Sequence, residues 1–380
     1  MLGASAKLLV VERRFGAPSW RVSLGLVVTA IAAVLLASTV WQAFWLSREA
    51  GTDVGALSRE RVAVQLQRQI FPLLVDIQQY RLQTQVLRNP PLAPDLRARV
   101  DADMARTTQF VRAHDGQLEV LGKWNDVQKL WSQVRSLKRV YNGPLITRFA
   151  RSLRYDVIYH VEDTSGLEYE SNHYAQDFAD IAFAKLPSTL NEVGHSDFLV
   201  ENAQIRGSIP IPDRIRLAGL ISAMNPSAGD FDLNTDDWNS ILAQLPQHKL
   251  GNASDVGRYR ADSAAFMQAG SAFARYANTN VIMPETPSGN PAKTRALARA
   301  AIASSVVVND DVTRLLDRLL AVRSGYATAR NRYVYVTVLL AAVLLIGIML
   351  VVAELVARRD RDALMKAQQE SERLAAELAR

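Results

Sequence analysis

A cluster of polar side chains near residue 80 is the first feature of this chain that could bind a ligand. The cluster consists of Gln78, Gln79, Tyr80, Arg81, Gln83, Thr84 and Gln85. It interrupts an apolar helical stripe for two turns, and an Arg guanidinium matches a carboxylate or oxyanion with two parallel hydrogen bonds. The pattern predicts a pocket in which Arg81 clamps a small anion beside Gln78, Tyr80 and Thr84. A solvated helix face with an exposed Arg is the alternative interpretation.

A second polar segment lies about eighty residues further on. It reads Asp163-Thr164-Ser165-Gly166-Leu167 and is followed by Tyr169 and Tyr174. One interpretation is that Asp163, Ser165 and Tyr174 close a ligand pocket at the end of a helical bundle. The alternative is a helix stop, after which Asp or Ser caps the next helix.

The motifs of the common catalytic classes are absent from the sequence. It contains no GxxxxGK[ST] loop, no GxGxxG after a strand, no HExxH pair and no nucleophile elbow. There is no Cys, and the five His residues do not have the spacing of metal ligands. We therefore predict no catalytic residue, no metal site and no cofactor in this chain, while a kinase or cyclase output could lie beyond residue 380.

Composition and charge exclude further classes. The 380 residues include 44 Lys and Arg against 38 Asp and Glu, which gives a net charge of +6. This mild excess suits an anionic ligand or lipid, and we expect no nucleic-acid partner. The 19 Gly and 14 Pro make up about 9% of the chain, whereas roughly 12% is average. The shortage argues against a turn-rich β protein and against disorder.

Two uncharged stretches, of 26 and 21 residues, divide the chain. A helix needs about 20 apolar residues to cross a hydrocarbon core about 30 Å thick. A cleaved signal peptide is the alternative for the first stretch, but its apolar core would be shorter, and Trp41, Phe44 and Trp45 suit an aromatic belt. A buried core helix is the alternative for the second. We predict two membrane-spanning helices, at 22–46 and 333–356.

Basic residues flank both predicted spans on the side that we assign to the cytoplasm. They are Lys7, Arg13, Arg14 and Arg21 before the first span, and Arg358, Arg359 and Arg361 after the second. Because positive flanks stay in the cytoplasm, we expect a two-span protein of a bacterial inner membrane with both termini inside. The predicted segments are 1–21 (cytoplasmic), 22–46 (span), 47–332 (periplasmic), 333–356 (span) and 357–380 (cytoplasmic connector).

The periplasmic segment is predicted to be all-α, because its apolar residues recur every three or four positions. The first expected helices lie at about 57–88, 95–137, 145–162 and 170–204. Short turns between them predict an up-down bundle over about 47–205. The pattern of 206–332 is less regular and suggests a second, stacked bundle. Trp124 and Trp131 are expected in the core or at a dimer face.

The C-terminal segment 357–380 has the heptad character of a coiled coil. Leu364 and Leu378 belong to its seam, but Asp360 also falls there, so the seam would be weak on its own. We expect one long helix from Ala292 through the second span into this connector. We also expect a parallel homodimer, held together by the membrane helices or the outer domain.

Three short motifs resemble the periplasmic helical-bundle sensor regions of bacterial receptors, namely chemoreceptors, sensor histidine kinases and diguanylate cyclases. The motifs are LLVDIQ at 73–78 with Arg81 and Thr84, DTSGL at 163–167 with Tyr174, Leu186-Pro187 and Gly194, and LLDRLL at 315–320. The first is similar to the IQxxRGxS helix of nitrate-sensor-like modules, with Leu82 at the Gly position. The resemblance covers roughly 50–330 plus both spans, and it implies a homodimer that signals through its membrane helices.

Together these features predict an inner-membrane sensor of the kind used in chemotaxis or two-component systems. It would bind a small anionic or polar ligand in the periplasm and pass a conformational signal to a cytoplasmic signalling partner. Two alternatives stay open, a membrane scaffold or assembly protein without signalling, and an enzyme whose active site lies in the outer helices.

The predicted membrane topology can be tested by fusing a reporter protein to the chain at chosen positions and finding on which side of the membrane the reporter lies. Fusions at Ala50 and Gly229 should report a periplasmic position, and a fusion at Arg380 should report a cytoplasmic one. A cytoplasmic signal from Gly229 would contradict the assignment.

Overall fold

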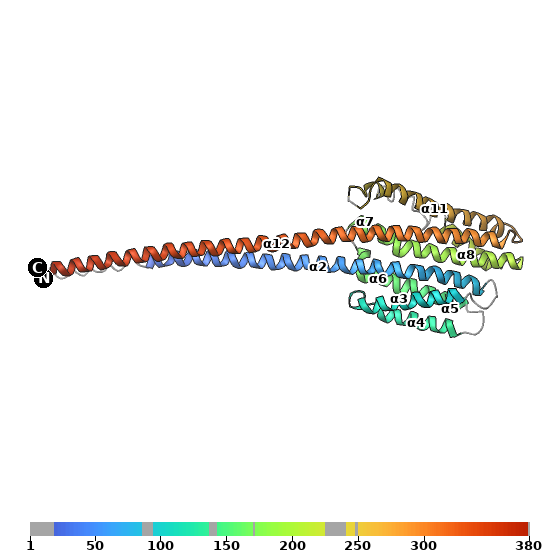
Figure 1. The fold of residues 1–380 in the computed structure, drawn as a ribbon, viewed down its shortest axis with the longest axis horizontal. Helices are drawn as coiled ribbons and strands as arrows, with labels where there is room; N and C mark the ends of the chain where they lie inside the picture. The colour runs from blue at the N-terminus through green and yellow to red at the C-terminus, as the bar shows by residue number, and fades with distance from the viewer. Residues whose placement is uncertain are drawn as a thin grey trace, which may run out of the picture. The chain divides into compact units, whose positions relative to one another are not determined.

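The computed structural model describes residues 19–85, 94–136, 143–169, 172–224, 241–247 and 250–378. In these residues every regular element is a helix and no β-strand occurs (Figure 1). The predicted all-α fold class is therefore confirmed. Most of the N-terminal basic flank, the turns expected at 89–93 and 141–142, and the polar stretch at 225–237 lie outside the described residues.

The chain divides into two compact units, and two long helices contribute residues to both. One unit combines Met1–Val54 with Gly325–Arg380, and the other is Gly55–Ser324. Helix α2 extends over Ser19–Gln85 and helix α12 over Pro291–Leu378. The expectation of one long helix from about residue 292 is confirmed by α12.

Exposed apolar side chains characterise the first unit. On α12 they include Leu339, Leu340, Val343, Leu344, Leu350 and Val351, and on α2 they include Ile31, Val34, Leu35 and Val40. Within the described residues α12 is the one helix that is long and apolar enough to cross a membrane, and none of its most apolar stretch is buried. One membrane-capable helix is therefore present, and the span expected at 22–46 stays a prediction.

Two polar contacts join α2 to α12 within this unit. The hydroxyl groups of Ser47 and Tyr335 share a hydrogen bond. Arg330 Nη2 donates to Asp53 Oδ2 at 2.6 Å. Both contacts lie at or just beyond one end of the uncharged stretches of α2 and α12.

The second unit, Gly55–Ser324, contains the remaining helices. They are α3 (Pro94–Leu118), α4 (Leu121–Ser136), α5 (Gly143–Arg151), η1 (Ser152–Ile158), α6 (Tyr159–Ser165), η2 (Leu167–Tyr169), α7 (His173–Ala179), η3 (Asp180–Lys185), α8 (Leu186–Arg206), α9 (Ile211–Ala223), α11 (Ala253–Ala277) and η4 (Asn278–Ile282). Within this unit α3, α4 and α5 lie on one side of α2, and α8, α11 and α12 lie on the other (Figure 1). Because the region forms one compact unit, its subdivision near residue 205 stays a prediction.

The second predicted helix is in fact two helices. Helix α3 ends at Leu118 and α4 begins at Leu121. Between them Glu119 has a positive φ of 51°, a left-handed conformation that interrupts the helix. The Asp115 carboxylate accepts a hydrogen bond from Leu121 N at 2.8 Å and satisfies one free N–H at the start of α4. The sequence does not predict this helix break, because Glu119 is neither Gly nor Pro.

The third and fourth predicted helices are confirmed, and each contains a wider π-helical turn. Segment η1 lies between α5 and α6, and η3 lies between α7 and α8. A third such segment, η4, continues α11. Turns of this kind are rare and often accompany functional sites. Their positions could not be predicted from a 3.6-residue pattern, because a π turn needs only one additional residue.

Aromatic residues fill the core between α2, α4 and α5. The ring centres of Tyr80 and Trp131 are 5.5 Å apart in an edge-to-face arrangement, and Phe149 lies 5.6 Å from Trp131. Trp124 is fully buried, and its Nε1 donates to Thr108 Oγ1 at 2.9 Å. The predicted core position of both tryptophans is confirmed.

A glycine permits the close approach of α2 and α8. A Cβ atom on Gly194 would lie 2.4 Å from Gln78 Oε1 and 3.0 Å from Gln78 Cβ. The second distance involves an atom next to the α2 backbone, so rotation of the Gln78 side chain would not relieve the contact. Gly194 therefore sets the distance between these helices.

We predict that Gly194→Ala destabilises the protein by about 1–3 kcal/mol, because the added methyl group forces the two helices apart. Gly219→Ala on α9 is the matched control, since no atom lies within 4 Å of the added Cβ. That control should be neutral or slightly stabilising, because Ala favours a helix over Gly. Chemical unfolding of the full chain, followed by circular dichroism, measures both changes, and equal stability of the two variants would refute the packing argument.

Candidate functional site

The residues predicted to form one ligand site lie at two separate places. A Cβ atom on Gly166 would be 4.0 Å from Glu60 Oε1, so the segment at 163–167 lies near Glu60 of α2. Arg81 is twenty-one residues further along the same helix, which corresponds to about 30 Å. The two polar segments therefore do not line a common pocket.

Asp163, Ser165 and Tyr174 make contacts that stabilise the local fold. Gly166 ends α6 with a φ of 92°, and its N–H donates to Asp163 O at 3.1 Å. Ser165 Oγ donates to a carbonyl of the preceding turn at 3.0 Å. The Tyr174 hydroxyl donates to Gln244 Oε1. This geometry agrees with the alternative interpretation, a helix stop.

The polar residues near position 80 face different neighbours. Tyr80 packs in the aromatic core, where burial raises the pKa of its hydroxyl. Gln78 lies against Gly194 of α8, and Arg81 also faces α8. The side chain of Thr84 lies outside the described residues. Among the described side chains of the predicted cluster, Gln78 and Arg81 share α8 as a neighbour.

Arg81 is buried in an electropositive environment. Only 3% of its surface is exposed, and its Cζ lies 5.9 Å from the ring centre of Phe198. Burial, and then the charge of Arg216, lower the pKa of Arg81 to about 10. Burial, followed by Arg81 and Arg216, lowers the pKa of His195 to about 3. At neutral pH Arg81 is therefore charged and His195 is not.

A small hollow lies where α2, α8 and α12 meet. Its volume is about 60 Å³, which corresponds to about two water molecules or one small anion. It is lined by Gln78, Gln79 and Leu82 from α2, Gly194 and Asp197 from α8, and Arg295, Arg299 and Ile302 from α12. Gln78 was predicted as a site residue. The cations at this hollow come from α12, and Arg81 does not line it.

A buried ion pair fastens α12 to α8 beside the hollow. Arg295 Nε and Nη2 donate to Glu201 Oε1 and Oε2 at 3.0 and 2.7 Å. The Glu201 side chain is completely buried, and such a two-point contact fixes orientation as well as distance. Next to it, Thr294 Oγ1 donates to Gln204 Oε1 at 2.9 Å. These polar contacts hold Arg299, one turn further along α12, at the hollow.

Asp197 contributes a neutral carboxyl group to the hollow. Burial and then the charge of Glu201 raise its pKa to about 8, although Arg295 and Arg299 act in the opposite direction. At pH 7 the group is therefore mostly protonated. A protonated carboxyl can donate a hydrogen bond to an anion, whereas a carboxylate would repel it.

The chemistry of the lining favours a small anion. Glu201 balances the charge of Arg295, so Arg299 leaves the hollow with a net positive charge. The Gln78 amide and the Asp197 hydroxyl are further possible donors. No group of His, Cys, Asp and Glu in the described part of the chain could hold a metal ion.

Sequence reasoning missed Asp197, Arg295 and Arg299. The spacing of Arg295 and Arg299 could have indicated that they act together, because residues four positions apart lie on the same face of a helix. No comparable signal existed for Asp197, because only burial gives it a neutral carboxyl group.

Comparison with known proteins adds no assignment. No protein-family model matches the chain, and neither a curated protein nor a solved structure matches it. The resemblance to helical sensor regions therefore depends on the short motifs alone.

Between about pH 4 and pH 8, the ionisation of Asp197 should lower the free energy of unfolding of the wild type as the pH rises. We predict that Asp197→Asn removes this part of the decline. In the unfolded chain an Asp ionises near pH 4, whereas folded Asp197 ionises near pH 8. Between these values the folded state holds one more proton than the unfolded state. The contribution of Asp197 to the free energy of unfolding is therefore complete below pH 4 and is lost as the pH rises to 8. An Asn cannot ionise, so the variant should gain stability relative to the wild type as the pH rises.

Chemical denaturation of the full chain at several pH values measures this difference. Asp126→Asn on α4 is the control, because it removes one exposed carboxyl group outside the hollow. Parallel curves for Asp197→Asn and the wild type would show that Asp197 is ionised in the folded protein.

Proposed function

We propose that this chain is a membrane-anchored sensor that binds a small anion in the hollow between α2, α8 and α12. One observation carries the proposal. Helix α12 contributes Arg295 and Arg299 to the hollow, and the same helix contains the exposed apolar stretch that is long enough to cross a membrane. A receptor needs such an element, because the ligand must act on a helix that continues through the bilayer.

Binding would favour one arrangement of the three helices. Gln78, Asp197 and Arg299 belong to α2, α8 and α12, so an anion can bond to all of them only when these helices are in the right register. A ligand that prefers one arrangement raises its population. A tenfold preference corresponds to about 1.4 kcal/mol. The movement would be a small slide or rotation of α12 against α8.

The membrane arrangement that we propose has two spans, at 22–46 and 333–356, with 47–332 in the periplasm of a bacterial inner membrane. Large apolar side chains are exposed on both helices of the first unit. Trp41 and Trp45 on α2, and Tyr333 on α12, are also exposed and suit the aromatic belt of a membrane surface.

For signalling we propose a parallel homodimer whose connector, 357–380, contacts a cytoplasmic output module. Leu364 and Leu374 are 70% and 53% exposed on α12, as expected for heptad positions that a second helix covers. The output could be a kinase, a cyclase, a methyl-accepting domain or a separate protein. A scaffold without signalling is the competing proposal, and ligand binding distinguishes the two.

The test is calorimetric titration of the full chain in lipid nanodiscs with chloride, formate, nitrate and acetate, a series of increasing size. We expect at least one of these anions to bind. Arg299→Ala should weaken that binding by roughly 10- to 150-fold, because it removes a charge-assisted contact. Arg260→Ala is the matched control, since Arg260 is an exposed Arg of α11 that does not line the hollow.

Two results would contradict the sensor proposal. One is that none of the four anions binds to the wild type. The other is that Arg299→Ala and Arg260→Ala bind with the same affinity. Either result would favour the scaffold.

A further inference from the structure

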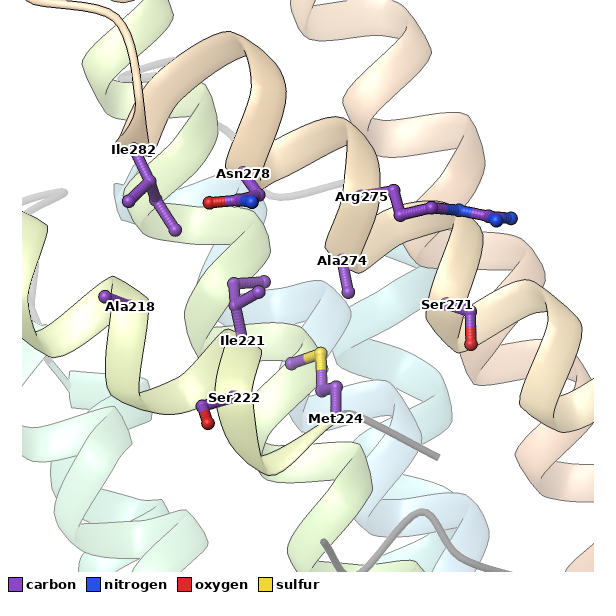
Figure 2. Close-up of a pocket in the computed structure, with 9 residues that line it drawn as sticks. All are labelled: Ala218, Ile221, Ser222, Met224, Ser271, Ala274, Arg275, Asn278 and Ile282. Atoms are coloured by element: carbon purple, nitrogen blue, oxygen red, sulfur yellow. The ribbon is translucent and has the colours of Figure 1, made fainter. Parts of the chain in front are cut away.

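A second and much larger hollow lies between α9 and the end of α11. Its volume is about 520 Å³, within the usual range of small-molecule sites, about 300–1,000 Å³. It is lined by Ala218, Ile221, Ser222 and Met224 on one side, and by Ser271, Ala274, Arg275, Asn278 and Ile282 on the other (Figure 2). None of these residues belongs to the small hollow at α12.

The walls of this hollow combine apolar side chains with a few polar ones. In Figure 2, Ile221 of α9 and Met224, which follows α9, point toward Asn278 and Ala274 on the opposite wall. Arg275 extends along α11 on the side of Ser271. Among the described residues of the lining Arg275 is the one charged side chain, and none of them is a carboxylate.

Local structure keeps the two walls apart and in place. The π-helical segment η4 begins at Asn278, at the hollow itself. Leu217 of α9 packs with Ala277 and Val281 in a buried apolar cluster. Arg214 joins α9 to the chain beyond η4, because its Nη2 donates to Glu285 O at 2.9 Å. The buried cluster and the Arg214 hydrogen bond therefore both hold α9 against the α11–η4 segment.

We propose that this hollow is a second ligand site, which binds a small amphipathic monocarboxylate with an aromatic or branched apolar body. The apolar body would lie between Ile221, Met224 and Ala274, and the carboxylate would pair with Arg275 at the edge. The positive charge of Arg275, with no carboxylate among the described lining residues, favours an anion over a cation. The volume is several times that of the hollow at α12, so the two sites take ligands of different size. This proposal does not depend on the proposed sensing of a small anion.

The test uses 4-benzoylbenzoate, a photoreactive carboxylate with two aromatic rings, and the full chain in lipid nanodiscs. After irradiation, mass spectrometry of peptides locates the labelled residues. We expect saturable labelling of the α9 and α11–η4 walls. The neutral analogue 4-benzoylbenzyl alcohol should compete about tenfold less well, because it cannot pair with Arg275.

Two pairs of variants make the result specific. Ala218→Trp should abolish labelling by filling the hollow, whereas Ala265→Trp places the same bulk on an exposed position of α11 that does not line it. Arg275→Ala should weaken apparent affinity about tenfold, whereas Arg260→Ala should not. Arg299→Ala should leave this labelling unchanged, which separates the two sites.

Three results would overturn the proposal. They are labelling confined to other segments, unchanged labelling of Ala218→Trp, and equal affinity of Arg275→Ala and Arg260→Ala. Because Ala218 and Arg275 are both exposed, their replacement leaves the buried core intact.

Discussion

The buried ion pair between Glu201 and Arg295 is the contact on which the arrangement of α8 and α12 depends. Removing one partner of such a pair costs about 3–5 kcal/mol, because the other charge is left in the interior. An apolar pair could supply similar stability, so the particular effect of the ion pair is to fix register. That register places Arg299 at the small hollow and keeps the charge of Glu201 close to Asp197.

Around this pair the bundle buries titratable groups and neutralises some of them. The pKa of Asp197 rises and that of His195 falls, and burial is the main cause of both shifts. Both groups are therefore uncharged near pH 7, while Arg81 retains its charge. The common cause is the low polarity of the interior, which penalises any charge without compensation. At the small hollow Glu201 balances the charge of Arg295, and Arg299 is the other cation of the described lining.

Helix α9 connects the buried charges to the larger hollow. Leu217 packs in the core against α8 and α11, and the charge of the adjacent Arg216 acts on both Arg81 and His195. Ile221, one turn later, faces the larger hollow. A displacement of this short helix would therefore change the electrostatic environment of Arg81. Helix α9 therefore lies between the larger hollow and the buried charges of Arg81 and His195.

The sequence by itself determined the helical class, most helix positions and an apolar helix fit to cross a membrane, because periodicity and composition are local properties of the chain. It also identified the turn of α2 that carries Gln78. Only the tertiary structure decided the break at Glu119, since it depends on a left-handed backbone that Glu rarely adopts. The same holds for the site. Gln78, Asp197 and Arg299 are each more than a hundred positions apart along the chain, and they meet only because α2, α8 and α12 pack together. Burial by those helices, which no local pattern encodes, gives Asp197 its neutral carboxyl group.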